Sequence, residues 1–337
     1  MTNPIIAKDL ASITASSIVP WQDLESANIL ITGANGMLPS YMVETILSLS
    51  NKAHVFALVR NVDKAYQRFS NYPDNKNLSI IVQDIAEPFI FMHNIDYIIH
   101  AASTATPIKF VTSPAEVVTP NTIGTYNCLE LARKDDVKAM LFFSSGEVYG
   151  ETTANPIRET SFGTIDPLNI RYCYAESKRM GETLCAAWNK QYRVPVKIVR
   201  PFHTYGPGMQ LGDGRVFSDF VADVLHQRDI ILTGDPTVKR TFCYLSDATI
   251  AYFLVMLQGL TREAYNVGGD ERFEISVLLL AQMLAEKYHL NVIRKSSNEL
   301  AAFQQRVPDI SKVRALGWEP QVSVPEGFRR TVESFTR

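Results

Sequence analysis

Asn28-Ile-Leu-Ile-Thr-Gly-Ala-Asn-Gly-Met-Leu38 begins with an apolar run and passes through two glycines into a helical pattern. We predict from it a buried strand, a tight turn that uses Gly33, and a helix. Gly36 lets the backbone approach a pyrophosphate, whose negative charge is favoured at the N-terminus of a helix. Pro39 stands where a third glycine is usual, so we expect the helix to survive but to pack differently on the strand. The stretch is typical of the entry to a dinucleotide-binding fold.

Short β-rich runs alternate with helical patterns along the following residues. Such alternation predicts an α/β fold with a parallel, doubly wound sheet of the Rossmann type. From about Pro201 the pattern becomes irregular and contains glycine-rich loops, which indicates a smaller α/β lobe that binds the substrate. The expected strands are Ile29–Thr32, His54–Val59, Ser79–Val82, Tyr97–His100, Met140–Ser144 and Val196–Val199.

These patterns divide the chain into three regions. Residues 1–26 form an N-terminal extension, which is either an added helix packed on the sheet or an arm at a subunit contact. Residues 27–200, with a return segment at about 241–262, form the dinucleotide-binding Rossmann domain. The substrate-binding lobe takes residues 201–240 and 263–337.

A hydroxyl, a phenol and an ammonium occur at spacings that suit one hydride-transfer site. Tyr174 and Lys178 lie on one face of a predicted helix, so the ammonium can stabilise the phenolate. We expect this to lower the tyrosine pKa from its ordinary value of about 10 and to make Tyr174 a catalytic acid and base. Ser145, at the end of an apolar strand, is placed to hold the same substrate oxygen.

The composition of the chain argues against several classes of protein. The chain has 337 residues with 33 basic and 35 acidic side chains, so we expect no nucleic-acid partner. Its four cysteines lack metal-ligand spacing, and we expect reduced thiols and no metal. It has no apolar run of about 20 residues and no signal-peptide pattern, from which we expect a cytoplasmic protein without a membrane contact.

Further segments extend the pattern over nearly the whole chain. They are His100-Ala-Ala-Ser103, Asn121-Thr-Ile-Gly-Thr125, Arg200-Pro-Phe-His-Thr-Tyr-Gly-Pro207, Asp213-Gly-Arg-Val216, Arg240-Thr-Phe242 and Gly317-Trp-Glu-Pro320. With the motifs above, they resemble the extended short-chain dehydrogenase/reductase family, in its NAD(P)-dependent nucleotide-sugar epimerase and dehydratase group. The overall pattern is most similar to UDP-glucuronate decarboxylases.

The resemblance implies an enzyme, a set of ligand contacts and a homodimer formed through the helices beside Tyr174 and Lys178. A nucleotide-diphosphate sugar would contact Thr104, His203, Arg215 and Arg240, whose guanidinium groups suit phosphate oxygens. His203 replaces an Asn of many relatives and is either a ligand contact or a packed loop histidine. The implied cofactor contacts are Gly33, Asn35, Gly36, Met37, Arg60, Asp84, Ile85, Ala101, Ala102, Ser103 and Lys178.

The choice of cofactor depends on the end of the second strand, Leu58-Val-Arg-Asn61. A carboxylate there would accept hydrogen bonds from the ribose of NAD, and none is present. Arg60 can instead pair with a 2′-phosphate. We therefore expect NADP(H), with NAD as the alternative.

The residue after Ser145 bears on the reaction. Similar dehydratases carry Asp there and similar decarboxylases carry Ser, whereas this chain has Gly146 followed by Glu147. A single carboxylate cannot readily be both acid and base in an elimination, which disfavours dehydration and weakens decarboxylation. We count Glu147 with Tyr174, Lys178 and Ser145 as the catalytic set.

Hydride transfer at C4 of a nucleoside-diphosphate hexose needs none of the missing groups. We therefore expect an NADPH-dependent 4-keto-sugar reductase, for example of a dTDP-4-keto-6-deoxyhexose. The alternative is a UDP-glucuronate decarboxylase or a nucleotide-sugar 4-epimerase with recycled NAD(P). A more remote alternative is a non-catalytic sensor that binds a nucleotide sugar or NADP.

Overall fold

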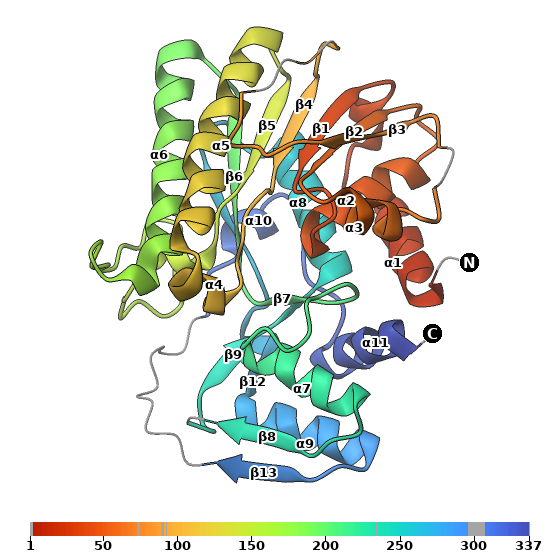
Figure 1. Cartoon of the computed structure of the whole chain (residues 1–337), viewed down its shortest axis with the longest axis vertical. Helices are drawn as coiled ribbons and strands as arrows, with labels where there is room; N and C mark the ends of the chain where they lie inside the picture. The colour runs from red at the N-terminus through yellow and green to blue at the C-terminus, as the bar shows by residue number, and fades with distance from the viewer. Residues whose placement is uncertain are drawn as a thin grey trace.

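A seven-stranded parallel sheet forms the centre of the larger part of the molecule (Figure 1). The structure is a computed structural model that describes residues 3–72, 75–88, 91, 93–233, 235–295 and 307–336. The strand order is β11-β6-β5-β4-β1-β2-β3, so the order reverses between β1 and β4. The strands are β1 (Asn28–Thr32), β2 (His54–Val59), β3 (Leu78–Val82), β4 (Tyr97–His100), β5 (Ala139–Phe143), β6 (Val196–Pro201) and β11 (Ala264–Val267).

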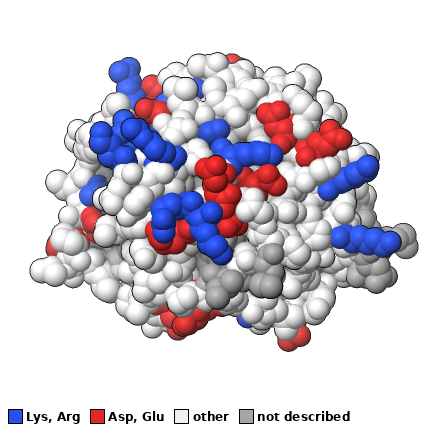
Figure 2. Space-filling view, turned by 90° about the horizontal axis from the view of Figure 1, so that it is seen from above, with Lys and Arg blue, Asp and Glu red and all other residues white. Residues whose placement is uncertain are grey.

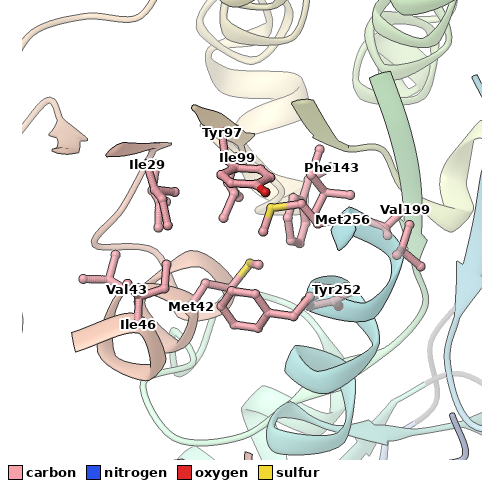
Figure 3. Close-up of a cluster of buried hydrophobic side chains, with 14 of the residues drawn as sticks. Ile29, Met42, Val43, Ile46, Tyr97, Ile99, Phe143, Val199, Tyr252 and Met256 are labelled. Atoms are coloured by element: carbon pink, nitrogen blue, oxygen red, sulfur yellow. The ribbon is translucent and has the colours of Figure 1, made fainter. Parts of the chain in front are cut away.

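Alternate side chains of the strands pack on opposite faces of this sheet, because the side-chain period of a strand is two residues. One face is covered by α2 (Met37–Ser48), α3 (Val62–Arg68) and α8 (Leu245–Gln258). Figure 3 shows Ile29 and Phe143 of this face directed towards Met42 and Tyr252 of the covering helices.

The opposite face carries Leu30, Phe56 and Met140, which pack with Cys128 and Cys185. The helices on this side are α4 (Pro107–Thr112), α5 (Pro114–Asp135) and α6 (Cys173–Tyr192). Helices on both faces of a parallel sheet make a Rossmann fold, as predicted.

The sheet has one more strand than we predicted. The strands predicted up to Val199 are all present, with ends that differ by at most two residues. The additional strand, β11, pairs with β6 so that Ala264 lies opposite Ile198. It follows directly after the return segment that we placed at about 241–262, and its four residues are too few to show a period.

A second lobe lies below the sheet in Figure 1 and has its own apolar core of Phe217, Phe220, Phe242, Leu280 and Phe328. Its strands pair as β7 (Thr204–Tyr205) with β10 (Cys243–Tyr244), β8 (Ile230–Thr233) with β13 (Val292–Lys295), and β9 (Lys239–Thr241) with β12 (Glu274–Ser276). Its helices are α7 (Val216–Leu225), α9 (Val277–Tyr288) and α11 (Val324–Thr336). The short elements elsewhere are η1 (Trp21–Leu24), η2 (Gly146–Tyr149), η3 (Ile170–Tyr172), η4 (Glu271–Phe273) and α10 (Ser311–Arg314).

The N-terminal extension contains a helix, α1 (Pro4–Thr14), which packs on α2, α8 and α11. Leu10 and Ile13 join a small apolar cluster with Tyr41 and Leu245. The Asn3 amide donates a hydrogen bond of 2.9 Å to the Ser334 carbonyl, and the two chain ends lie close together in Figure 1. The extension thus contains an added helix, which packs on helices of both parts of the molecule.

The surface mixes charges of both signs. Figure 2, which looks onto the top of the molecule, shows Lys and Arg side chains beside Asp and Glu. All four cysteines are free thiols. In the described ranges, no helix has the length and apolarity that crossing a bilayer requires, and no three His, Cys, Asp or Glu side chains are grouped to hold a metal.

Candidate active site

A cavity of about 800 Å³ lies where the carboxyl ends of the sheet strands face the second lobe. This edge includes the point between β1 and β4 where the strand order reverses, which is the usual ligand position in such sheets. The lining runs from the turn after β1, across the ends of β4 and β5, to residues of α7 and α9 in the lobe. The cavity is therefore placed to hold two ligands that meet between the sheet and the lobe.

The turn after β1 allows no side chain at Gly33. Its φ is +65°, and a Cβ there would lie 2.7 Å from the Cα of Ala102. The Thr32 hydroxyl accepts hydrogen bonds from the backbone N–H groups of Ala101 and Ala102, which fixes the turns after β1 and β4 against each other. Such a bare backbone edge fits a dinucleotide pyrophosphate.

His100, at the end of β4, connects the turn after β1 to helix α5. Its ring nitrogens hydrogen-bond to the Thr32 hydroxyl at 2.8 Å and to the Thr125 hydroxyl at 3.1 Å. Burial lowers the pKa of His100 to about 3, so the ring is neutral at physiological pH. His100 therefore acts as a structural bridge between the strand ends and α5.

Helix α6 carries the predicted acid–base pair into the cavity. Tyr174 is 7% exposed and Lys178 is 2% exposed. Burial raises the pKa of Tyr174 to about 12, and a hydrogen bond with Ser145 opposes this rise. Tyr174 and Ser145 are therefore within hydrogen-bonding reach of each other, which suits two groups that hold one substrate oxygen.

The pKa of Tyr174 is raised by burial, whereas we expected Lys178 to lower it. The Lys178 ammonium donates a hydrogen bond of 2.6 Å to the Phe143 carbonyl and lies 5.8 Å from the centre of the Tyr174 ring. Burial lowers the pKa of Lys178 itself to about 7. The expectation was wrong because the spacing of two residues on a helix face does not show how deeply they are buried. Burial raises the pKa of Tyr174 and lowers the pKa of Lys178.

The low pKa of Lys178 has a measurable effect on stability. Above pH 7, Lys178 of the folded chain has lost its proton, whereas Lys178 of the unfolded chain keeps it up to about pH 10.4. Because the unfolded state then binds one more proton, raising the pH favours the folded state. We expect the free energy of unfolding of the nucleotide-free protein to rise between pH 7 and 9 relative to Lys178→Met, with a slope of up to about 1.4 kcal/mol per pH unit. Denaturant titrations at several pH values measure this slope. Lys190→Met, an exposed lysine on the same helix, should show no such difference.

A buried polar network holds the segment Ser144–Gly150 in place. The Ser144 hydroxyl donates to the Glu182 carboxylate, which also receives two hydrogen bonds from Arg200, of 2.8 and 2.6 Å. Arg200 donates in turn to the Tyr149 hydroxyl at 2.8 Å. We predicted no role for Glu182, although its position four residues after Lys178 puts both on one helix face.

The structure brings most of the predicted site residues together around the cavity. Asp84 and Thr104 fall outside its lining. The Asp84 carboxylate instead accepts a hydrogen bond from the Ala86 N–H. Thr104 lies in a non-helical segment between Ser103 and Ala105, which both line the cavity, so its side chain is expected on the other side of the chain. The predicted residues that line it are Gly33, Asn35, Gly36, Met37, Arg60, Ile85, Ala101, Ala102, Ser103, Ser145, Glu147, Tyr174, Lys178, His203, Arg215 and Arg240.

A side chain at Gly146, such as similar enzymes carry, would crowd the ring of Phe202. A Cβ there would lie 3.0 to 3.1 Å from the ring of Phe202. Among the described lining residues Glu147 is then the one carboxylate, and its charge is close enough to raise the pKa of Tyr174. Within the described lining, Glu147 is thus the one carboxylate that can move a proton alongside Tyr174.

The lining also contains a stack that our sequence analysis missed. The ring of Phe110 lies parallel to the ring of Tyr174, with centres 4.9 Å apart and 6° between the planes. The guanidinium carbon of Arg171 lies 5.1 Å from the centre of the Phe110 ring. The position of Arg171, three residues before Tyr174, indicated that these two residues are close together. Nothing in the sequence indicated Phe110, which lies in α4 and is 64 residues from Tyr174 along the chain.

The sequence model of the NAD dependent epimerase/dehydratase family matches residues 29–268. The chain belongs to this family. It is 32% identical to UDP-glucuronic acid decarboxylase 6 of Arabidopsis thaliana over 309 residues, which cover 91% of the chain and 88% of the relative. It is also 32% identical to UDP-glucuronic acid decarboxylase 1 of Danio rerio over 313 residues, which cover 92% of the chain and 72% of the relative.

A solved structure of a UDP-glucose 4-epimerase with UDP-glucose, from Thermotoga maritima, matches with a TM-score of 0.79 and 26% identity. The match covers 92% of this chain and 98% of that one. Membership of the epimerase/dehydratase family confirms the family resemblance, the Rossmann fold and the prediction of an enzyme. The family is described as dependent on NAD, and our preference for NADP(H), drawn from Arg60, finds no support in it.

Proposed function

We propose that this family member decarboxylates a UDP-linked hexuronate, UDP-glucuronate in the first instance, through a 4-keto intermediate. The observation that carries the proposal is the likeness to UDP-glucuronic acid decarboxylases over 91% of the chain. It favours the alternative reading of our sequence analysis over the 4-keto-sugar reductase. The convergence of Tyr174, Ser145 and Glu147 on one cavity supports it.

In this reaction the chain's own residues act on the oxygen at C4. Tyr174 takes the proton from the C4 hydroxyl, and Ser145 holds the same oxygen by a hydrogen bond. NAD, when bound, accepts the hydride from C4 and returns it at the end of the cycle. It would lie against the bare turn of Gly33 and Gly36, with Lys178 at the nicotinamide ribose.

Oxidation at C4 makes the sugar a β-keto acid, since the C6 carboxylate is then two carbons from the ketone. The bond between C5 and C6 breaks, carbon dioxide leaves, and its bonding electrons pass to the C4 oxygen as an enolate. Tyr174 and Ser145 stabilise that oxygen by hydrogen bonds. Glu147 assists in returning a proton to C5, and reduction at C4 completes a UDP-pentose.

We further propose that the resident cofactor is NAD. The family description supports it, and a cofactor regenerated in every turnover needs no cellular NADPH. Arg60 then lies at the exposed end of β2 beside the adenosine ribose rather than on a 2′-phosphate. Chromatography of the nucleotide released from the denatured protein should give NAD, and a release of NADP would contradict this assignment.

A second candidate is 4-epimerisation, which shares the 4-keto intermediate. The observation that favours it is the match at 26% identity to a UDP-glucose 4-epimerase over 92% of the chain. The two reactions differ after oxidation at C4. In an epimerase the keto sugar rotates in the site and is reduced on its opposite face. In a decarboxylase the keto sugar first loses C6 as carbon dioxide.

Mass spectrometry of the sugar nucleotide separates these functions. We expect UDP-glucuronate, incubated without added reductant, to lose carbon dioxide, and UDP-glucose to stay unchanged. A product of unchanged mass and altered configuration would establish the epimerase. Consumption of NADPH with a 4-keto-6-deoxy sugar, and no reaction of UDP-glucuronate, would overturn the proposal in favour of the reductase.

We also propose a homodimer, which light scattering would test. Ile123 and Tyr126 of α5 and Met180 of α6 are each about half exposed, and they would supply an apolar contact between subunits.

A further inference from the structure

The two hydroxyl groups that meet the C4 oxygen come from different elements of the sheet domain. Tyr174 lies in the first turn of α6, and Ser145 follows directly after β5. The Ser145 hydroxyl accepts a hydrogen bond of 3.1 Å from the Glu147 N–H, so its place follows that of η2. A shift of about 1 Å in such a group can cost roughly 100-fold in rate. The reaction therefore depends on what holds η2 against α6.

Helix α6 holds the end of β5 through the side chains of one face. Lys178 and Glu182 follow Tyr174 at intervals of four residues, which places all three on that face. The Lys178 ammonium donates a hydrogen bond of 2.6 Å to the Phe143 carbonyl. The Ser144 hydroxyl donates to the Glu182 carboxylate. The two residues that precede the catalytic serine are thus each bonded to α6.

The Glu182 carboxylate is itself held by Arg200 of β6, the strand next to β5. The guanidinium donates to one carboxylate oxygen at 2.8 Å and to the other at 2.6 Å, and both side chains are largely buried. Arg200 also donates to the hydroxyl of Tyr149, the last residue of η2, at 2.8 Å. The ion pair therefore holds η2 at both ends, through Ser144 before it and through Tyr149.

A buried ion pair of this kind contributes little net stability. Taking two charges out of water costs about as much as their attraction returns, so apolar residues of similar volume often replace such a pair without loss. The pair between Glu182 and Arg200 instead supplies direction, because two parallel hydrogen bonds fix the plane of the carboxylate. The oxygen that receives the Ser144 hydroxyl is then in a defined place.

We propose that Glu182 is a positioning residue, which sets the Ser145 hydroxyl against the Tyr174 hydroxyl by way of Ser144. The inference rests on the part of the proposed function that decarboxylation shares with 4-epimerisation and 4-keto reduction, namely two hydroxyl groups at the C4 oxygen. Loss of the link through Glu182 displaces a hydrogen bond that stabilises the transition state. It should therefore lower kcat and leave KM nearly unchanged.

A double-mutant cycle with Ser145 tests this role through decarboxylation of UDP-glucuronate by the cofactor-loaded protein. We expect Ser144→Ala to lower kcat by about 10-fold and Glu182→Gln by about 10- to 100-fold, with KM changed by less than about 3-fold. In a Ser145→Ala background, the same substitutions should lower kcat by less than about 3-fold, because the group that they position is already absent. Equal losses in both backgrounds would show that Glu182 does not act through Ser145.

Glu44→Gln is the matched control for a loss of stability. Glu44 is buried, pairs with Arg68 at 2.6 Å and lies outside the cavity lining. The variant removes a buried carboxylate of the same kind and should leave kcat within about 2-fold of the unchanged protein. A loss of kcat in Glu44→Gln as large as that in Glu182→Gln would overturn the proposal, because general destabilisation would then explain both.

Hydrogen exchange, followed by mass spectrometry of peptides that contain η2, tests the same role without a substrate. The N–H groups of Val148 and Gly150 close this turn by hydrogen bonds of 3.2 and 3.0 Å to backbone carbonyls. We expect these amides to exchange about 10-fold faster in Ser144→Ala than in the unchanged protein, and at the original rate in Glu44→Gln. Unchanged exchange in Ser144→Ala would mean that η2 does not depend on this link, which overturns the proposal.

Failure of the proposed function has a different signature. A parent protein that leaves UDP-glucuronate unchanged would refute decarboxylation before any residue is replaced. The cycle is then run on the sugar nucleotide that the parent converts, since epimerisation and 4-keto reduction use the same two hydroxyl groups. The exchange rates of η2 decide the role of Glu182 in either case.

Discussion

Replacing Tyr174 with Phe is expected to lower kcat by about 1,000-fold while the affinity for the nucleotide sugar changes by no more than a few-fold. The substitution removes only the hydroxyl that exchanges a proton with the C4 oxygen. The ring remains, so the stack on Phe110 and the burial of the site are preserved. Turnover measured by mass spectrometry and affinity measured by calorimetry separate the two effects.

Tyr172→Phe provides the matched control. Tyr172 lies two residues before Tyr174, and its hydroxyl hydrogen-bonds to the Glu151 carboxylate outside the cavity lining. We expect it to retain most of the activity of the unchanged enzyme. If Tyr174→Phe kept more than about a tenth of the activity, proton transfer by Tyr174 would not be part of the reaction.

Replacing Asp9 with Ala is expected to lower the free energy of unfolding by about 3–5 kcal/mol, the usual cost of removing one partner from a buried ion pair. Asp9 is fully buried and accepts hydrogen bonds from the Tyr244 hydroxyl at 2.7 Å and the Tyr41 hydroxyl at 3.1 Å. It also pairs with Arg330 of α11 at 3.1 Å. The Ala variant leaves these groups without that acceptor, and denaturant titration measures the loss.

Two further variants serve as controls for the loss of stability expected in Asp9→Ala. Asp9→Asn keeps an acceptor oxygen and should cost less than Asp9→Ala. Lys8→Ala changes an exposed neighbour on the same helix and should lie within about 0.5 kcal/mol of the unchanged protein. If Asp9→Ala fell in the same range as Lys8→Ala, the α1 helix would not be fastened through Asp9.

Local patterns predicted the parts of the fold that local chemistry determines. The apolar run before Gly33 gave β1, and the turn at Gly33 has the positive φ that only glycine adopts without strain. Tyr174 and Lys178 lie on one helix and reach the cavity, as their spacing predicted. Each of these features depends on residues close together in the sequence.

Features that depend on tertiary contacts could not be predicted in this way. Phe110 reaches Tyr174 from α4, and no spacing in the sequence connects these two helices. The pKa of Lys178 follows from burial, which periodicity does not measure. The closeness of Phe202 to Gly146 is likewise a contact between distant residues that no spacing in the sequence shows.

The choice among reactions had a similar limit. Gly146 and Arg60 together led us towards an NADPH-dependent reductase, although the overall pattern already resembled UDP-glucuronate decarboxylases. Likeness over 309 residues to decarboxylases carries more information than one position, and it changed the order of the hypotheses.

The ion pair between Asp9 and Arg330 joins residues 321 positions apart. Because a ribosome adds about 5–20 residues per second, Arg330 is made roughly 15 to 65 seconds after Asp9. During that interval the nascent Rossmann sheet has its first helix but lacks the last helix, which supplies the guanidinium partner. The contact between Asp9 and α11 therefore forms only after Arg330 has been synthesised.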